Sequence, residues 1–213
     1  MDRPNRFIAH VDIGGCREAV HVKNTGRCRE LLIPGARVLL THSFDTKRKT
    51  AFDLVAVYKE GAGLINIDSQ APNRVAYEWL SLQDFDLIRP EYVYGESRID
   101  FYMERRGEKF LMEVKGCTLE VDGVGFFPDA PSDRAVKHLR ELVKALKEGY
   151  RAVICFVIPM EGVTEVRPCE AIHPEFARAF KEAIEAGVKV INLPCRVYED
   201  GFEVTEDMKG KIL

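Results

Sequence analysis

The sequence predicts a two-domain protein of the α+β or α/β class, with a small β-barrel over residues 1–68 and a mixed sheet flanked by helices over residues 69–213. The first third of the chain reads as short apolar strands separated by turn residues. Apolar residues at helical spacing begin only after Pro72. This change from short strands to helical spacing of the apolar residues places the domain boundary near residue 68.

The N-terminal domain is predicted to contain five short strands. Turn signals rich in glycine, asparagine and proline separate them. Five strands in about sixty residues favour a small closed barrel of the OB type, and an SH3-like barrel fits the pattern almost as well. The expected strands cover residues 7–13, 19–22, 36–42, 52–58 and 64–67.

The C-terminal domain is predicted to alternate helices and strands. A helix follows Pro72, and a hairpin turns at Arg106-Gly107. A second helix begins at Ser132, which can cap it, and ends at Gly149. A buried strand over residues 151–159, a helix over 174–186 and a strand over 188–197 complete the order. This order predicts a mixed sheet with helices packed on it.

Composition narrows the class of protein. The net charge is −3, from 31 Lys and Arg against 34 Asp and Glu, so nucleic-acid binding would depend on local basic patches. No apolar run is long enough to span a membrane, and the N-terminus lacks the apolar core of a signal peptide. The six cysteines form no C-x-x-C pair, which argues against a zinc ribbon. We therefore expect a cytoplasmic protein without a membrane partner.

The predicted hairpin carries the most informative residues. If Arg106-Gly107 forms a two-residue loop, Asp100 lies opposite Glu113, and the two side chains share a face. Lys115 shares that face with Glu113 because side chains alternate along a strand. Two carboxylates this close can hold one Mg²⁺ or Mn²⁺ ion. With a lysine beside them, they suit metal-assisted cleavage of a phosphodiester.

The acid-x-Lys pattern by itself is weak evidence. It occurs at residues 45–47, 113–115 and 207–209, and only the middle copy lies in an apolar strand with a second acid across a hairpin. A solvated hairpin face with alternating charge is the alternative that the spacing leaves open.

The helices on either side of the hairpin add candidates. Glu78, on the preceding helix, is a candidate third metal ligand. On the following helix Arg134 and His138 are i,i+4 neighbours with Lys137 beside them, a cluster suited to hold a scissile phosphate. The apolar stripe of that helix must face the sheet, and we expect His138 to reach the acid pair. Solvated helix faces are again the alternative.

These features together resemble known proteins. The order of acidic helix, acid–acid–lysine hairpin and basic helix resembles the PD-(D/E)xK nuclease superfamily, with Asp100, Glu113 and Lys115 at its named positions. Nearly the whole chain is similar to the sugar fermentation stimulation protein A family. The motifs that carry this similarity lie at residues 24–26, 31–38, 47–50, 96–100, 113–115, 118–119, 127–130 and 137–142.

The resemblance implies a DNA-binding protein with an OB-like domain and a restriction-endonuclease-like domain. The acid pair would hold Mg²⁺ or Mn²⁺, Lys115 would act on the attacking water, and His138 would contact phosphate. This chain has Lys23 and Arg27-Cys28 where the family usually has Pro and Ser-Met, which makes the turn more basic. The residues expected to bind nucleic acid are Asn24, Arg27, Arg29, Lys47, Arg48, Lys49, Arg134 and Lys137.

Three functions stay open at the level of sequence. One is a metal-dependent nuclease; DNA is favoured over RNA as its substrate, but the sequence does not decide between them. A second is a non-catalytic DNA-binding regulator of sugar metabolism genes with a silent nuclease-like site. A third is a protein that binds a small nucleotide between its domains. The sequence also leaves open whether the chain forms a homodimer.

Overall fold

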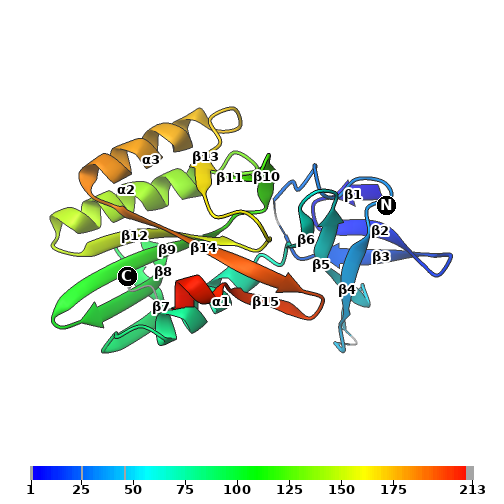
Figure 1. Cartoon of the computed structure of the whole chain (residues 1–213), viewed down its shortest axis with the longest axis horizontal. Coiled ribbons are helices and arrows are strands. Elements are labelled where there is room, and N and C mark those ends of the chain that lie inside the picture. Colours follow the sequence, from blue (N-terminus) through cyan, green and yellow to red (C-terminus); the bar gives the residue numbers. More distant parts are fainter. Residues whose placement is uncertain (1, 25, 46, 210–213) are drawn as a thin grey trace.

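The computed structural model describes residues 2–24, 26–45 and 47–209. Thr25 of the motif at residues 24–26 and Thr46 lie outside the described residues. All five strands predicted for the N-terminal domain are present, and one further strand precedes them (Figure 1). The strands are β1 (Asp2–Asn5), β2 (Ile8–Ile13), β3 (Cys16–Val22), β4 (Val38–His42), β5 (Phe52–Lys59) and β6 (Gly63–Asn66).

The N-terminal strands form a curled sheet in the order β1-β2-β3-β5-β4, with β6 paired to β5. Ala9, Val20 and Leu54 are fully buried in its core. Leu31 and Leu32, in the connection between β3 and β4, belong to the same core. Among the described strands β1 and β4 are not paired with each other, so the sheet is a half-barrel, more open than the closed barrel expected. Side chains of the connection between β3 and β4 complete the core at the place where a closed barrel would have another pair of hydrogen-bonded strands.

The C-terminal domain is built on a mixed sheet in the order β15-β14-β12-β9-β8-β7, as the alternation of elements predicts. The central strands β9, β12 and β14 run parallel, and the others pair antiparallel. Strand β12 is buried from its second residue onward, as expected for a strand covered on both faces. The strands are β7 (Leu87–Tyr94), β8 (Ser97–Arg105), β9 (Glu108–Gly116), β12 (Arg151–Ile158), β14 (Lys189–Tyr198) and β15 (Gly201–Val204).

Helices cover both faces of this sheet (Figure 1). Helix α1 (Ala71–Ser81) packs through Val75 and Trp79 on one face. Helices α2 (Asp133–Lys147) and α3 (Pro174–Ala186) lie side by side on the other face. Ser132 caps α2 as predicted, since its side chain accepts a hydrogen bond from the Ala135 amide at 3.3 Å. A short helix, α4 (Glu206–Lys209), ends the described chain.

A small sheet is formed by three segments for which the sequence predicts no strand. Strands β10 (Leu119–Val121), β11 (Val124–Phe127) and β13 (Val166–Pro168) form it in the order β10-β11-β13. These strands have only three or four residues each, too few for a clear alternating pattern.

Specific polar contacts fix the N-terminal domain against the C-terminal sheet. The Asn66 amide donates to the Pro159 carbonyl at 3.0 Å, and the Tyr58 hydroxyl donates to Glu199 Oε1 at 2.9 Å. Buried apolar residues of both domains form one continuous cluster. The two domains therefore share a defined junction at which a binding site can form. In the described part of the chain no helix is long and apolar enough to cross a membrane.

Candidate metal centre and interdomain cavity

The two carboxylates lie on a hairpin with the predicted geometry. Arg106 and Gly107 have φ values of 51° and 81°, as a two-residue turn of type I′ requires. The β8–β9 ladder has the predicted register and ends one step before Asp100 and Glu113. Continuing that register places these two residues opposite each other.

Asp100 lies where the backbone ladders on both sides of β8 are interrupted. The β7–β8 ladder skips Glu91, whose φ is 55°, and the β8–β9 ladder has ended. The Val114 amide donates to Asp100 Oδ2 at 2.7 Å, and Asn73 Nδ2 donates to Oδ1 at 2.8 Å. The carboxylate is therefore held by one donor from β9 and one from α1.

The charge of Asp100 is poorly compensated in this position. Burial, reinforced by the Glu113 carboxylate, raises the pKa of Asp100 from 3.8 to about 6. Lys115 and the two hydrogen bonds act in the opposite direction without cancelling this rise. The electrostatic effect of Glu113 on Asp100 indicates that the two acids are close in space.

Glu113 is deeply buried, at 2% exposure, and one of its oxygens is fully occupied. Both Lys115 Nζ and His138 Nδ1 contact Oε1. Burial by itself would raise the pKa of Glu113, but the lysine and the histidine outweigh burial and lower it. The other oxygen, Oε2, is buried and has no hydrogen-bond partner among the described residues. Glu113 thus presents an ionised oxygen that is left unsatisfied.

His138 reaches the acid pair from α2, as the apolar stripe of that helix predicts. Its side chain is 5% exposed, and its Nδ1 faces Glu113. Its Nε2 accepts a hydrogen bond from Arg134 Nε at 3.4 Å, which leaves the proton on Nδ1. Both ring nitrogens are therefore engaged within the protein. This arrangement suits a group that orients Glu113 better than one that contacts phosphate.

Glu78 lies away from the pair. It is exposed on α1 and lines a separate hollow beside residues 198–202. Five residues separate it from Asn73, which turns the helix by about 140°. Asn73 is the α1 residue that contacts Asp100. The described residues contain no group of three His, Cys, Asp or Glu side chains arranged to hold a metal ion.

The predicted phosphate-binding residues do not form one cluster. Lys137 lies 3.8 Å from Glu141 and lines a separate hollow formed by α2 and Glu175 of α3. Arg48 donates to both oxygens of Asp53, so its charge is already neutralised. The other expected contacts are all exposed, and the described residues give them no carboxylate partner: Arg27, Arg29, Lys47 and Lys49.

Asn24 has a structural role at the domain junction. Its Nδ2 donates to the Ile67 carbonyl at 2.9 Å, and its Oδ1 accepts from the Gly26 amide at 2.6 Å. A Cβ at Gly26 would lie 2.5 Å from Asp129 Oδ2, so a side chain there would force the Asp129 carboxylate to move. This turn therefore packs directly against the C-terminal domain.

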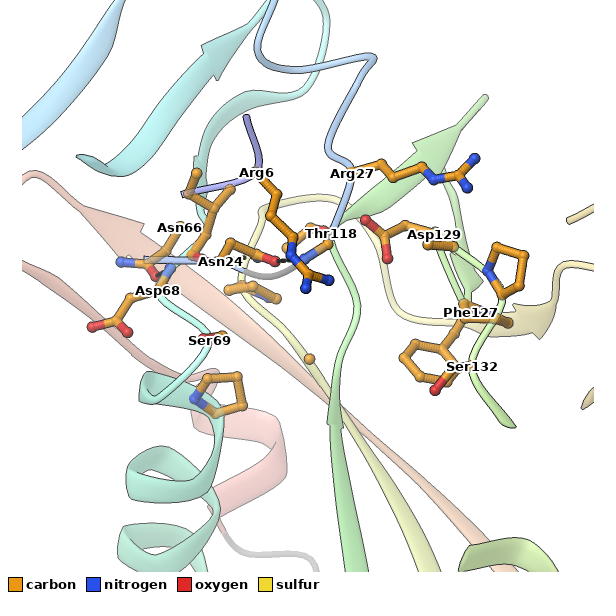
Figure 2. A pocket seen from close by; sticks show the side chains of 18 residues that line it. Arg6, Asn24, Arg27, Asn66, Asp68, Ser69, Thr118, Phe127, Asp129 and Ser132 are labelled. Atoms are coloured by element: carbon orange, nitrogen blue, oxygen red, sulfur yellow. Dashed lines mark hydrogen bonds between the residues drawn. The ribbon is translucent and has the colours of Figure 1, made fainter. Parts of the chain in front are cut away.

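A cavity of about 630 Å³ lies between the two domains (Figure 2). Strand β9 borders it at Gly116, the residue after Lys115, and α1 borders it at Pro72, the residue before Asn73. The cavity thus begins beside the acid pair. Its other walls are formed by Arg6, Asn24, Gly26, Arg27, Thr118, Pro159 and residues 66–69 and 127–132.

Charge in the cavity is unevenly compensated. Asp68 is neutralised by Lys23 at 2.9 Å and Arg74 at 3.3 Å. The Arg6 guanidinium points into the middle of the cavity (Figure 2). Within the described ranges it has no carboxylate partner and only stacks over the Phe7 ring at 4.9 Å.

Sequence reasoning singled out Asn24 and Arg27 and kept open a nucleotide site between the domains, but it did not identify most of the residues that line the cavity. Arg6, Thr118 and Phe127 come from segments far apart in the chain, and no spacing rule brings them together. The available signal was indirect: the motifs at residues 24–26, 118–119 and 127–130 all contribute to its wall.

Comparisons with known proteins place the chain in a family. Residues 1–67 match the model described as the SfsA N-terminal OB domain, and residues 70–201 match the sugar fermentation stimulation protein RE domain. The sugar fermentation stimulation protein homolog of Clostridium beijerinckii is 49% identical, over 96% of this chain and 92% of that protein. The homolog of Ruminiclostridium cellulolyticum is 46% identical, over 100% of this chain and 95% of that protein.

A solved structure has the same fold. SfsA of Pyrococcus furiosus, in complex with Ca²⁺, superimposes with a TM-score of 0.82 at 30% identity, covering 94% of this chain and 88% of that chain. The chain belongs to the sugar fermentation stimulation protein family, with an N-terminal OB domain and a nuclease-like C-terminal domain.

Proposed function

We propose that this member of the family is a DNA-binding protein whose C-terminal domain binds one divalent cation, Mg²⁺ or Mn²⁺, at Asp100 and Glu113 and cleaves phosphodiester bonds. The observation that carries the proposal is the buried Oε2 of Glu113, which has no hydrogen-bond partner in the part of the chain that the structure describes. A buried charged oxygen without a partner is costly, and a cation would satisfy it.

The donor set fits a hard cation. Carboxylate oxygens are the ligands that Mg²⁺ and Mn²⁺ prefer, and Mg²⁺ commonly uses one or two carboxylates while keeping several waters. Two carboxylates are what this site offers. A cation would also neutralise the repulsion that raises the pKa of Asp100. The Pyrococcus furiosus protein was solved in complex with Ca²⁺, which supports the binding of a divalent cation by this chain.

Each side chain at the site would have a separate role in catalysis. A bound cation would activate a water and stabilise charge on the phosphate. His138 and Lys115 hold Glu113 through one oxygen and leave the other free. Lys115, at 15% side-chain exposure, is accessible enough to donate to a phosphate oxygen. Asn73 fixes the orientation of Asp100 from α1.

The DNA-binding part of the proposal is supported by the OB domain and by exposed cations. OB folds bind nucleic-acid strands with basic groups and exposed rings. Lys47 and Lys49 lie in the connection between β4 and β5, close in sequence to Phe44, whose ring is 90% exposed. Because the net charge of the chain is −3, binding would be local and sensitive to salt.

One observation favours a second candidate, the non-catalytic DNA-binding regulator. Both oxygens of Asp100 already accept hydrogen bonds, from Asn73 and Val114. An acid held in this way can be part of a site that has kept its shape without activity.

A metal titration followed by a cleavage assay distinguishes the two candidates. For a nuclease, Mn²⁺ should bind to the parent protein and DNA should be cleaved, Glu113→Gln should abolish both, and Lys115→Ala should abolish cleavage while sparing metal binding. Glu78→Gln is the matched control because this exposed acid lies away from the pair. DNA binding without cleavage in every divalent ion tried would establish the regulator.

A further inference from the structure

We infer that the interdomain cavity binds one unpaired nucleotide of a DNA strand that continues to the acid pair, so that the preferred substrate is single-stranded. The inference rests on the proposed function, which it deepens by naming the substrate class.

The position of the cavity supports this inference. Its wall at Gly116 is one residue, or about 3.8 Å between Cα atoms, beyond Lys115 on the same strand. A Cβ at Gly116 would lie 2.8 Å from Pro72 Cγ, so the first turn of α1 packs directly on β9. This close approach brings Asn73 to Asp100 and forms the cavity floor at Pro72. The cavity and the acid pair thus share two structural elements.

Arg6 supplies a cation for a phosphate group. Its guanidinium points into the cavity (Figure 2), and no carboxylate of the described chain pairs with it. The same wall contains two acids: Asp68 is neutralised by Lys23 and Arg74, and Asp129 accepts a hydrogen bond from the Cys28 amide at 3.3 Å. An arginine presented without a partner in a concave site is suited to bind an anion such as a phosphate.

The helices add to this preference for an anion. Pro72 in the first turn of α1 and Ser132 at the N-cap of α2 both line the cavity. The N-terminus of a helix carries a partial positive charge, and here two such ends border the same space as the free guanidinium.

The remaining wall suits a base and a sugar. Phe127 offers a ring, and Thr118 and Ser69 offer hydroxyl groups that can donate or accept hydrogen bonds. A volume of about 630 Å³ lies in the range of sites for a single small ligand. A base within a duplex would have to leave its stack and its partner to enter, whereas a base in a single strand would not.

The inference is tested by fluorescence anisotropy with a short single-stranded DNA and a blunt duplex of the same sequence, in EDTA so that binding does not depend on the cation. The parent protein should bind the single strand at least about tenfold more tightly, because the duplex must give up a stacked base. Arg6→Ala should weaken single-strand binding by about tenfold. Arg178→Ala is the matched control, since it removes an arginine of α3 that has no ion-pair partner in the described chain.

A cavity-filling variant provides the second arm. Ala130→Trp places a large ring in the wall and should abolish the preference for the single strand, with a circular-dichroism melt to verify folding. If Ala130→Trp does not fold, the Arg6→Ala comparison decides. Equal binding of single strand and duplex by the parent protein, or equal effects of Arg6→Ala and Arg178→Ala, would overturn the inference. Either result would leave metal binding at Asp100 intact, so failure here is distinguishable from failure of the proposed function.

Discussion

Asp100 shows how a functional residue can lower the stability of its own fold. Its folded pKa of about 6 exceeds the ordinary value of 3.8. Above pH 6 the carboxylate is ionised in both the folded and the unfolded protein. Its burial then raises the free energy of the folded state only. As the pH falls from about 6 to about 4, the folded state takes up the proton first, so stability increases. A bound cation would remove this cost.

Asp100→Asn should therefore stabilise the protein in EDTA at pH 7. The expected gain is on the order of 2–3 kcal/mol; it should become small as the pH falls to about 4 and vanish below that, where the parent acid is protonated in both the folded and the unfolded state. Thermal melts of parent and variant across this pH range measure it. Adding Mn²⁺ should make the parent more stable than the variant, because only the parent binds the ion. A variant less stable than the parent at pH 7 in EDTA would contradict this account of the charge.

His138→Ala should weaken the binding of Mn²⁺ at pH 7. Without the histidine, Glu113 loses one of the two groups that keep its pKa low, while its burial remains. The loss should be about 10-fold or more, as for other residues that orient a metal ligand. Isothermal titration measures it. Lys144→Ala, an exposed position on the same helix, is the control and should leave the affinity unchanged.

At the scale of the element, the sequence predicts the strongly patterned segments and misses the short or interrupted ones. The stripe of α2 and the turn at Arg106-Gly107 are fully encoded locally, and both are confirmed. Strand β7 is not predicted because Pro90 and Glu91, with its φ of 55°, break its apolar run, which an edge strand tolerates. Strands β10, β11 and β13 are too short to show a period.

The same distinction holds for the candidate site. The sequence brings Asp100 and Glu113 together because a hairpin register is local. It could not select Asn73 over Glu78, since that choice depends on how α1 is rotated against the sheet. It also could not separate Arg48, which Asp53 neutralises, from the lysines on either side of it.

Substitutions in the β4–β5 connection test whether Lys47 and Lys49 bind DNA while Arg48 has a structural role. Lys47→Ala with Lys49→Ala should weaken single-strand binding and reduce the salt slope by up to about 0.7 for each phosphate that these lysines neutralise in the parent protein. Stability should be unchanged because both side chains are exposed. Arg48→Ala should instead cost about 1–2 kcal/mol of stability, since Asp53 is part-buried and loses two donors. Anisotropy at several salt concentrations measures the change in DNA binding, and thermal melts measure the change in stability. An Arg48→Ala variant that is as stable as the parent but binds DNA less well would contradict the structural role of Arg48.

At the scale of the whole molecule, binding of cation and of DNA should be coupled. The acid pair repels phosphate until a cation neutralises it, while Arg6 and the OB domain attract it. Because coupling between two ligands is reciprocal, a cation that improves DNA binding must bind more tightly when DNA is present.

Adding Ca²⁺ should therefore raise the affinity of the parent protein for single-stranded DNA by about 10-fold, within the usual range for coupled sites. Asp100→Asn should bind DNA better than the parent in EDTA and gain little from Ca²⁺, since its repulsive charge is gone. Anisotropy titrations with and without Ca²⁺ measure both. An affinity of the parent protein that does not depend on Ca²⁺ would place the DNA away from the acid pair.

The central claim is that Asp100 and Glu113 hold one divalent cation. A crystal grown in Mn²⁺ tests it most directly, through anomalous scattering at the manganese absorption edge. The account predicts one peak within bonding distance of an Asp100 oxygen and of Glu113 Oε2, completed by water, and no such peak in Glu113→Gln. The absence of a peak in the parent protein, or a peak bound by other residues, would contradict it.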